Sequence, residues 1–378
     1  MWAPTAAMLA LSLVLPPPGT PTRPVLTRAE AAPYTSDAYL DGWRPAPIRT
    51  LGIRPDAIVH PGDSVQQAVN AVYRAGGSDR RYLELLPGTY TGTVFIPAGG
   101  PPLTIYGAGR PADVRIEFSV DAIITPAAWA QLVNPSGQYV DGDPAWSMYQ
   151  SCATRTQSNA GLCATVVWSK SPGLQLRGLT VVNTLLDTVD AGTHQAVAVR
   201  TEGDQTQLED VRLLGRQDTF YATGGRLSMR GSYVEGDTDF VFGDARAVFQ
   251  FDEFRLVSSR KPAGGVIFAP STAPANRFGF LVQFCLISAD AAGVAAPTGH
   301  LGRAWDQGAG STGYLPGVSP NGQLVIRDSL IRPGFNAAAP WAPAATTGRP
   351  FAARVDAGRD LDDPNYNRLW EAGDNLTF

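Results

Sequence analysis

The sequence has little charge and few side chains that bind metals. Only 17% of its 378 residues are charged, and it contains three histidines and three cysteines. Low charge combined with 44% hydrophobic residues excludes an intrinsically disordered chain. None of the histidines has ligand spacing to a cysteine, which argues against a zinc site. The net charge of −4 indicates no basic surface for nucleic acid, so we expect no nucleic-acid partner.

Long apolar runs are also missing, since no segment reaches the ~18 consecutive apolar residues of a membrane span. A shorter apolar run at residues 6–15 has the length of a signal-peptide core and is followed by a Pro-rich stretch and a cleavage-like Ala29-Glu30-Ala31. We therefore predict a signal peptide and linker at residues 1–31 and an exported protein. The usual basic residues before the run are absent, so a misassigned start or an uncleaved anchor are the alternatives.

The common signatures of several enzyme classes do not occur. The chain has no Gly-x-Ser-x-Gly segment, which disfavours a serine nucleophile of the α/β-hydrolase type. No glycine-rich nucleotide-binding loop follows a strand pattern.

The three cysteines divide into a pair and a single residue. Cys152 and Cys163 flank a short polar stretch, and in an exported protein they predict a disulfide that staples a surface loop. Cys285 lies in an apolar segment and is expected to be a buried free thiol.

Short apolar segments punctuated by 40 glycines and 31 prolines dominate the rest of the chain. Similar units recur about every 22 residues, which is the period of a parallel β-helix whose coils bury their apolar face by stacking. The clearest copies start at Leu176, Leu208, Met229 and Phe251, and weaker ones span 282–287 and 326–331. We predict one all-β domain at residues 32–378, a single-stranded parallel β-helix. A β-sandwich with irregular strands is the alternative.

Two segments depart from the repeat. Residues 64–73 have helical periodicity and predict a short N-terminal helix that caps the β-helix. Residues 125–160 predict a long loop excursion with four aromatic residues, which either walls a groove or packs a small core of its own.

Polar residues at the repeat spacing are the candidate catalytic groups. Gln217 follows Gln195, and Asp239 follows Gln217, each at about 22 residues, so we expect the three to stack on successive coils. Asp218 is then close to Asp239, and two such carboxyl groups are expected to have different pKa values. One carboxylate could attack while the other acid donates a proton, and the amides could stabilise an oxyanion. A polar ladder without catalytic purpose is the alternative.

His194 adjoins Gln195 in the sequence. Adjacent residues on a strand face opposite ways, so we expect His194 to be structural rather than catalytic.

The residues around these positions resemble the pectinesterases (pectin methylesterases), and in particular their bacterial, envelope-associated branch. The matching segments follow the family's order and are residues 195–200, 215–221, 239–243 and 301–305. The resemblance implies a right-handed parallel β-helix with a long cleft and no cofactor, in a secreted or cell-envelope (periplasmic) protein. It also implies a monomer that acts on pectin (homogalacturonan).

The resemblance assigns a role to each matching residue. It implies that Asp239 is the nucleophile and that Asp218 is the general acid and base. Gln217 and Gln195 would stabilise the oxyanion, and Arg303 would orient Asp239. The substrate-binding residues that it implies are Tyr221, Phe242, Trp305 and Thr238. Three positions differ from the family pattern, because Ala304 replaces a usual proline, Thr238 a common valine and Gly92 a frequent acidic residue.

Other functions were weighed against methyl-ester hydrolysis. An esterase or thioesterase for a different acyl substrate would need the same Asp and Gln groups. A non-catalytic polysaccharide-binding β-helix would have no need for paired carboxylates. A pectate lyase would require a calcium-binding acidic cluster and a basic catalytic residue.

Overall fold

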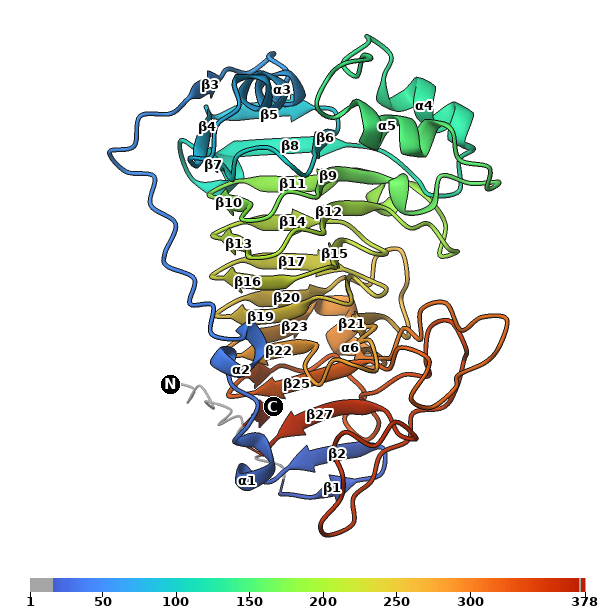
Figure 1. Cartoon of the computed structure of the whole chain (residues 1–378). Coiled ribbons are helices and arrows are strands. Elements are labelled where there is room, and N and C mark those ends of the chain that lie inside the picture. The colour runs from blue at the N-terminus through green and yellow to red at the C-terminus, as the bar shows by residue number, and fades with distance from the viewer. Residues whose placement is uncertain (1–15, 374, 378) are drawn as a thin grey trace, which may run out of the picture.

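The computed structural model describes residues 16–373 and 375–377 of the chain. Within these residues the strands form three long sheets, which the chain visits in rotation so that each turn of the chain lays one coil on the previous one (Figure 1). All neighbouring strands are parallel except the first two. The expectation of stacked parallel strands is therefore confirmed.

The sheets contain twelve, nine and seven described strands. The twelve-stranded sheet comprises, in spatial order, β1 (Gly19–Thr20), β2 (Arg23–Leu26), β27 (Arg368–Ala372), β25 (Gln323–Arg327), β22 (Phe280–Gln283), β19 (Arg246–Gln250), β16 (Arg226–Arg230), β13 (Thr206–Glu209), β10 (Gln175–Arg177), β7 (Leu103–Gly107), β4 (Arg81–Leu85) and β3 (Ala57–Val59). The nine-stranded sheet comprises β28 (Leu376–Thr377), β26 (Leu330–Ile331), β23 (Leu286–Ala289), β20 (Glu253–Leu256), β17 (Tyr233–Gly236), β14 (Arg212–Leu214), β11 (Thr180–Asn183), β8 (Val114–Phe118) and β5 (Gly88–Thr91). The seven-stranded sheet comprises β24 (His300–Gly302), β21 (Val266–Pro270), β18 (Val241–Gly243), β15 (Phe220–Ala222), β12 (Val197–Thr201), β9 (Thr165–Ser169) and β6 (Val94–Ile96).

The main core lies between the three sheets and is built by apolar residues at equivalent positions of successive coils. Leu176 pairs with Leu208, which pairs with Met229, as the repeat predicts. The next step differs, because Met229 pairs with Phe249 and not with Phe251. The turn between two sheets is shorter in that coil. The prediction therefore started this repeat unit at Phe251, two residues after Phe249, the residue that pairs with Met229.

The helix predicted at one end of the stack is present as α3 (Val65–Ala75). The hydroxyl of Ser64 caps it by accepting a hydrogen bond from the backbone N–H of Gln67. Val65, Val69 and Val72 are buried against the first coils, so α3 closes the apolar interior at this end.

The N-terminal segment forms part of the stack, which the sequence did not indicate. Strand β2 pairs in parallel with β27 at the opposite end from α3. The chain then forms α1 (Arg28–Ala31) and α2 (Ser36–Leu40) and runs back along the outer face of the twelve-stranded sheet to β3 (Figure 1). Residues 16–31 are therefore integrated into the fold and are not a linker, while residues 1–15 of the predicted signal peptide lie outside the described residues.

The excursion at 125–160 contains α4 (Pro126–Val133) and α5 (Trp146–Ala153). Trp129, Tyr139 and Met148 are buried in a separate apolar cluster with Phe95, so its aromatic residues do build a small core. The predicted disulfide between Cys152 and Cys163 is present, with the two Cα atoms 5.9 Å apart. Cys285 is a buried free cysteine, as expected.

The remaining helical elements are short. They are α6 (Ala291–Ala295) and three 3₁₀ turns at Pro111–Asp113, Gly161–Cys163 and Leu186–Thr188. Over the described part of the chain, none of the helices combines the length and the apolar character needed to cross a bilayer.

Candidate active site

Two aspartates occupy equivalent points on neighbouring coils, in the turns that lead from the nine-stranded to the seven-stranded sheet. Asp218 and Asp239 both have left-handed backbone conformations, with φ of 66° and 48°. Aspartate adopts this conformation more readily than most residues, and it lets the chain turn sharply before β15 and β18. The backbone N–H of Asp218 donates to the carbonyl of Thr238, which places the two carboxyl groups side by side.

The register differs by one residue from the spacing argument. Gln195 pairs with Gln217 as expected, but Gln217 pairs with Thr238 and not with Asp239. The coil is one residue shorter at this step, and consequently Asp218 rather than Gln217 lies opposite Asp239. The prediction that Gln195, Gln217 and Asp239 form one straight stack was wrong at its last member.

Asp239 is held by a bidentate ion pair with Arg303. The Nε atom of Arg303 donates to Oδ1 of Asp239 at 2.7 Å, and Nη2 donates to Oδ2 at 2.5 Å. Arg303 follows the last strand of the seven-stranded sheet, β24, where its backbone N–H donates to the carbonyl of Phe268. The planar guanidinium both orients the Asp239 carboxylate and stabilises its negative charge.

Asp218 is in a different environment, with only 3% of its surface exposed. Burial, and next the negative charge of Asp239, raise the pKa of the Asp218 carboxyl well above its usual value, against the opposing effects of Arg303 and Gln195. A carboxyl group in this setting keeps its proton to higher pH than an ordinary aspartate and can donate it. The environments of the two carboxyl groups therefore differ, because only Asp239 forms the ion pair with Arg303.

The two glutamines lie beside these carboxyl groups. The Oε1 atom of Gln217 accepts a hydrogen bond of 2.8 Å from the backbone N–H of His194, so the amide orientation is fixed and its NH₂ group is left to donate. Gln195 lies near enough to the Asp218 carboxyl to lower its pKa. Both amides therefore lie near the carboxyl groups, and their role as oxyanion donors stays a prediction.

The side chain of His194 contacts two aspartates. Its Nδ1 atom lies 2.6 Å from a carboxylate oxygen of Asp121, and its Nε2 atom lies 3.2 Å from one of Asp190. The ring is thus engaged on both sides, while the backbone N–H holds Gln217. This agrees with the structural role expected for His194.

Three predicted substrate-binding residues form one aromatic group on the outer face of the seven-stranded sheet. Tyr221 and Phe242 lie on adjacent strands with their rings stacked, 4.4 Å between centroids. Trp305 meets both rings edge-on, at 5.9 and 5.4 Å. Arg200 lies over the rings of Tyr221 and Trp168. Tyr221 and Phe242 are only 5% and 2% exposed, so Trp305 is the member of the group that is open to solvent. Arg200 is paired with Glu202 at 2.7 Å.

Thr238 has a more restricted position than predicted for a substrate-binding residue. It is 5% exposed, and its Oγ1 atom accepts a hydrogen bond of 3.2 Å from the Nζ atom of Lys261. Lys261 therefore carries a positive charge at the edge of the site. Sequence reasoning missed Lys261 because it lies in an irregular loop without repeat spacing.

Two further ion pairs support the loop that carries His194. Arg260 and Asp237 form a fully buried bidentate pair, and Arg260 also donates to the carbonyls of Asp190 and Gly192. Arg216 holds Asp187 at the start of the same loop in a second bidentate pair. Arg216 lies within the matching segment 215–221 and Asp237 just before 239–243, but nothing in the sequence identified their partners.

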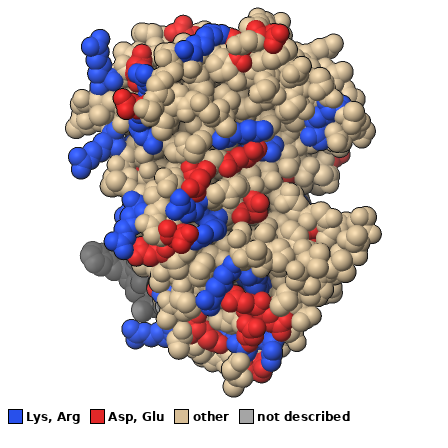
Figure 2. All heavy atoms as spheres, viewed as in Figure 1, with Lys and Arg blue, Asp and Glu red and all other residues tan. Residues whose placement is uncertain are grey.

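Loops from both ends of the seven-stranded sheet flank the site. The excursion with α4 and α5 precedes β9, and Arg303 opens the loop after β24, with β12, β15 and β18 between them. Figure 2 shows the molecular surface hollowed at one edge between these two regions. Leu162, which follows the excursion in the sequence, packs against the aromatic group, and its carbonyl accepts a hydrogen bond from Arg200. Of the two roles considered for the excursion, the structure bears out a small core of its own.

No group of three or more His, Cys, Asp or Glu side chains among the described residues is arranged to hold a metal ion.

The chain is similar to known proteins in both sequence and structure. Residues 149–310 match the family described as Pectinesterase. The chain is 48% identical to Pectinesterase B of Dickeya dadantii (strain 3937), an alignment that covers 94% of this chain and 90% of the relative. It is also 41% identical to the putative acyl-CoA thioester hydrolase YbhC of Escherichia coli (strain K12), over 94% of this chain and 88% of that protein.

A solved structure gives the same result in three dimensions. The rice weevil pectin methyl esterase matches with a TM-score of 0.89 and 40% identity, covering 96% of this chain and 99% of that one. Both sequence and fold thus agree over nearly the whole length. The chain belongs to the pectinesterase family of carboxylic-ester hydrolases.

Proposed function

We propose that this protein hydrolyses the methyl esters of pectin to pectate and methanol, with Asp239 as nucleophile and Asp218 as general acid and base. The observation that carries the proposal is the contrast between the two carboxyl groups, since Asp239 is paired with Arg303 while Asp218 is buried with a raised pKa. The relatives named pectinesterase and pectin methyl esterase support the substrate.

In the first half of the reaction, an oxygen of Asp239 attacks the ester carbonyl. Arg303 uses one lone pair on each carboxylate oxygen, so each oxygen has another available for the attack. Negative charge then develops on the former carbonyl oxygen, where the amide NH₂ groups of Gln217 and Gln195 donate hydrogen bonds. The intermediate collapses by breaking the bond to methoxide, which leaves as methanol with the proton of Asp218.

The second half regenerates the enzyme. Asp218, now a carboxylate, removes a proton from water as the water attacks the acyl carbonyl joined to Asp239. The bond to Asp239 breaks, and the acid product leaves with Asp239 ionised and Asp218 protonated again. Arg303 stabilises the departing carboxylate of Asp239.

The substrate chain lies along the hollow between the two groups of loops in this proposal. Trp305, which packs on the buried rings of Tyr221 and Phe242, offers an aromatic contact to a sugar ring. Lys261 is positioned by Thr238 to attract the free carboxylate of a neighbouring uronate unit.

We also propose a handedness for the β-helix and a location for the protein. A right-handed β-helix is supported by the strong general preference for right-handed crossovers between parallel strands. Export to the cell envelope or beyond, as a monomer, would place the enzyme where a polysaccharide substrate is accessible.

The decisive experiment is methanol release from highly methylated pectin by the wild-type protein and by Asp239→Ala and Asp218→Asn variants. The assay contains a metal chelator, so that calcium-dependent cleavage cannot contribute. Release that is lost in both variants is the expected result. A folded wild-type protein that releases no methanol from pectin would refute the proposal.

Thioester hydrolysis is the second candidate, favoured by the similarity to the Escherichia coli relative. The same two aspartates could act on an acyl thioester, because the attack on the carbonyl is chemically equivalent. Thiol release from acyl-CoA at a higher kcat/KM than methanol release from pectin would favour this candidate.

A further inference from the structure

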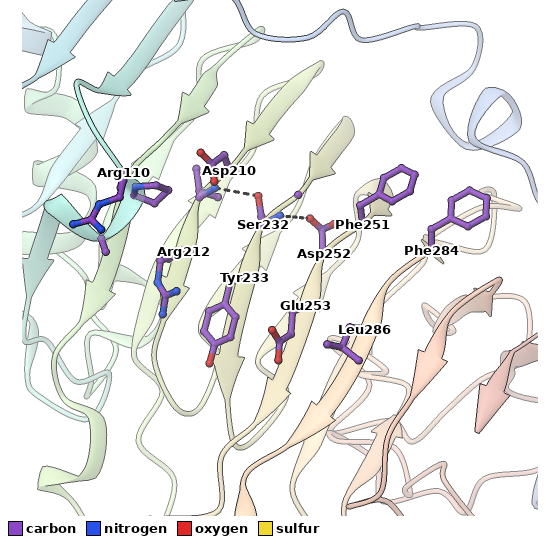
Figure 3. Close-up of a pocket in the computed structure, with 14 residues that line it drawn as sticks. Arg110, Asp210, Arg212, Ser232, Tyr233, Phe251, Asp252, Glu253, Phe284 and Leu286 are labelled. Atoms are coloured by element: carbon purple, nitrogen blue, oxygen red, sulfur yellow. Dashed lines mark hydrogen bonds between the residues drawn. The ribbon is translucent and has the colours of Figure 1, made fainter. Parts of the chain in front are cut away.

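A second groove lies at the corner between the twelve-stranded and nine-stranded sheets, with a volume of about 650 Å³. Figure 3 shows Tyr233, Glu253 and Leu286 on neighbouring strands along it, with Phe251 and Phe284 at one side. The catalytic residues lie at the other end of the strands of the nine-stranded sheet, in the turns that lead out of it. The groove therefore shares none of its lining with the candidate active site.

Phe251 and Phe284 have an unfavourable backbone conformation. Their φ angles are 59° and 58°, in the left-handed region that bulky side chains avoid. The equivalent turns of the three preceding coils hold Gly178, Asp210 and Gly231, residues that tolerate this region. The fold thus accepts glycine at this corner, and the two phenylalanines have a conformational cost. Strain of this kind at exposed positions indicates a functional constraint.

The two phenylalanines are also exposed to solvent. Phe251 is 50% and Phe284 45% exposed, and their rings stack on each other with centroids 5.3 Å apart. Each ring turns one face toward the other, and the remaining half of each side chain is open to solvent. Isolated exposed apolar residues need no explanation, but two that stack in a groove form a small apolar patch available to a ligand.

Cations accompany the aromatic rings. The guanidinium of Arg230 lies 4.5 Å from the ring centre of Phe251, and that of Arg212 lies 4.6 Å from that of Tyr233. Within the described residues, neither arginine has a carboxylate within 4.0 Å. Their charges are held in place by the rings and remain available to an anionic ligand.

The groove also offers hydrogen-bond acceptors. The carboxylate of Glu253 accepts a hydrogen bond from the hydroxyl of Ser288, and Asp210 is exposed at the same corner. Such carboxylates accept hydrogen bonds from sugar hydroxyls. The groove therefore combines ring surfaces, cations for carboxylates and acceptors for hydroxyls.

We propose that this groove is a non-catalytic binding site for an acidic polysaccharide. On the basis of the proposed function, its ligand is de-esterified polygalacturonate, the product region of the same polymer. Sugar rings stack on Phe251 and Phe284, and uronate carboxylates pair with Arg230 and Arg212. Binding there would keep the enzyme on a polymer whose methylated parts enter the active site.

The test compares wild-type protein with a Phe251→Gly/Phe284→Gly variant. Glycine removes the rings and relieves the backbone cost, so the variant is expected to fold normally. Leu51→Ala is the matched control, because Leu51 is an apolar residue that is 98% exposed outside the groove. The probe is long polygalacturonate, with binding measured by affinity electrophoresis and calorimetry. Methanol release is measured in parallel on long methylated pectin and on a short methylated oligogalacturonide.

We expect polygalacturonate to bind the double variant about tenfold more weakly than the wild type or the control, equivalent to about 1.4 kcal/mol. KM should rise on long pectin, while kcat on the short oligomer stays unchanged. Arg230→Gln should weaken binding and reduce its dependence on salt.

Unchanged affinity in the double variant would overturn the proposal even if methanol release is normal. A wild-type dimer that becomes a monomer in the double variant would also overturn it, since the groove would then hold a second copy of the chain. If the wild type releases no methanol but binds polygalacturonate in a ring-dependent way, the proposed esterase function fails and the groove assignment stands.

Discussion

Arg303 and Asp239 are 64 residues apart in the sequence and are joined by two hydrogen bonds of 2.7 and 2.5 Å. The pair links the loop after β24 to the turn before β18, so the orientation of Asp239 depends on a distant coil. The geometry of the fork, and not only its charge, fixes the carboxylate.

We therefore predict that Arg303→Lys lowers kcat by about 10²-fold, the scale of losing one preorganised electrostatic contact in an active site. Lysine keeps the charge but cannot donate two parallel hydrogen bonds. KM should change little, because Arg303 acts on the nucleophile. Steady-state methanol release is the measurement, with Arg354→Lys as the control, since Arg354 makes a similar fork with Asp356 on the surface. An Arg303→Lys enzyme as active as this control would contradict the assigned role.

The raised pKa of Asp218 predicts how activity depends on pH. The group must be protonated to release methanol, and burial together with Asp239 keeps it protonated to higher pH than a normal aspartate. We expect kcat/KM to fall as pH rises through this raised pKa. Asp218→Glu, which changes the position and burial of the acid, should move that limb of the profile. A kcat/KM that stays flat toward alkaline pH would rule out Asp218 as the acid.

The raised pKa of Asp218 also predicts how stability depends on pH, and stability should fall with rising pH as activity does. Because the folded-state pKa of Asp218 is raised, its carboxyl costs nothing below its unfolded pKa and destabilises the fold as pH rises through the folded value. Asp218→Asn should therefore raise Tm at neutral pH and leave it nearly unchanged near pH 3, while abolishing turnover. Thermal unfolding at the two pH values measures this, and a lower Tm at neutral pH would contradict it.

Asp252 offers the same test away from the active site. It is buried in the turn before β20, where one carboxyl oxygen accepts a 2.7 Å hydrogen bond from the backbone N–H of Ser232 and the other has no partner. Burial raises its pKa well above the usual value. Asp252→Asn keeps the acceptor and removes the titration.

We predict that Asp252→Asn raises Tm at neutral pH by about 1 °C or more, which corresponds to about 1 kcal/mol in a domain of this size. Near pH 3 the two proteins should unfold together, because the wild-type carboxyl is then protonated in both states. Methanol release should be unaffected. A gain that is equal at both pH values would show that the charge is not the cause.

The repeat spacing of the sequence predicted which residues of the candidate site lie on neighbouring coils. The structure brings together the four residues that this spacing indicated, which are Gln195, Gln217, Asp218 and Asp239. The exact register was not predictable, because the turn between sheets is one residue shorter before Asp239. Lys261 escaped prediction since its loop has no repeat to place it.

The fold was predictable wherever neighbours in the sequence are neighbours in space. Each coil stacks on the next, so short apolar segments reveal the pattern. Strand β2 is different, because Arg23–Leu26 contains proline, follows a Pro-rich stretch and pairs with β27 at the other end of the chain. Its buried Arg23 pairs with Glu371, a contact across 348 residues that no local pattern indicates.

The Cys152–Cys163 disulfide connects the excursion to the aromatic group of the site. The bond spans 11 residues and ends one residue after Leu162, whose side chain packs on the group and whose carbonyl accepts from Arg200. Loss of a disulfide that closes a loop of this size costs about 2–3 kcal/mol. We expect the excursion, and not the β-helix, to be destabilised, because the excursion has its own apolar cluster separate from the main core.

A Cys152→Ser/Cys163→Ser variant should therefore raise KM for pectin while leaving kcat, which depends on Asp239 and Asp218, nearly unchanged. Reductant should have the same effect on the wild type and none on the variant. Cys285→Ala is the control, since Cys285 is a buried thiol in the main core and forms no disulfide. Proteolysis in the 125–160 segment should increase in the double variant alone. A fall in kcat at constant KM would show instead that the disulfide maintains the catalytic groups.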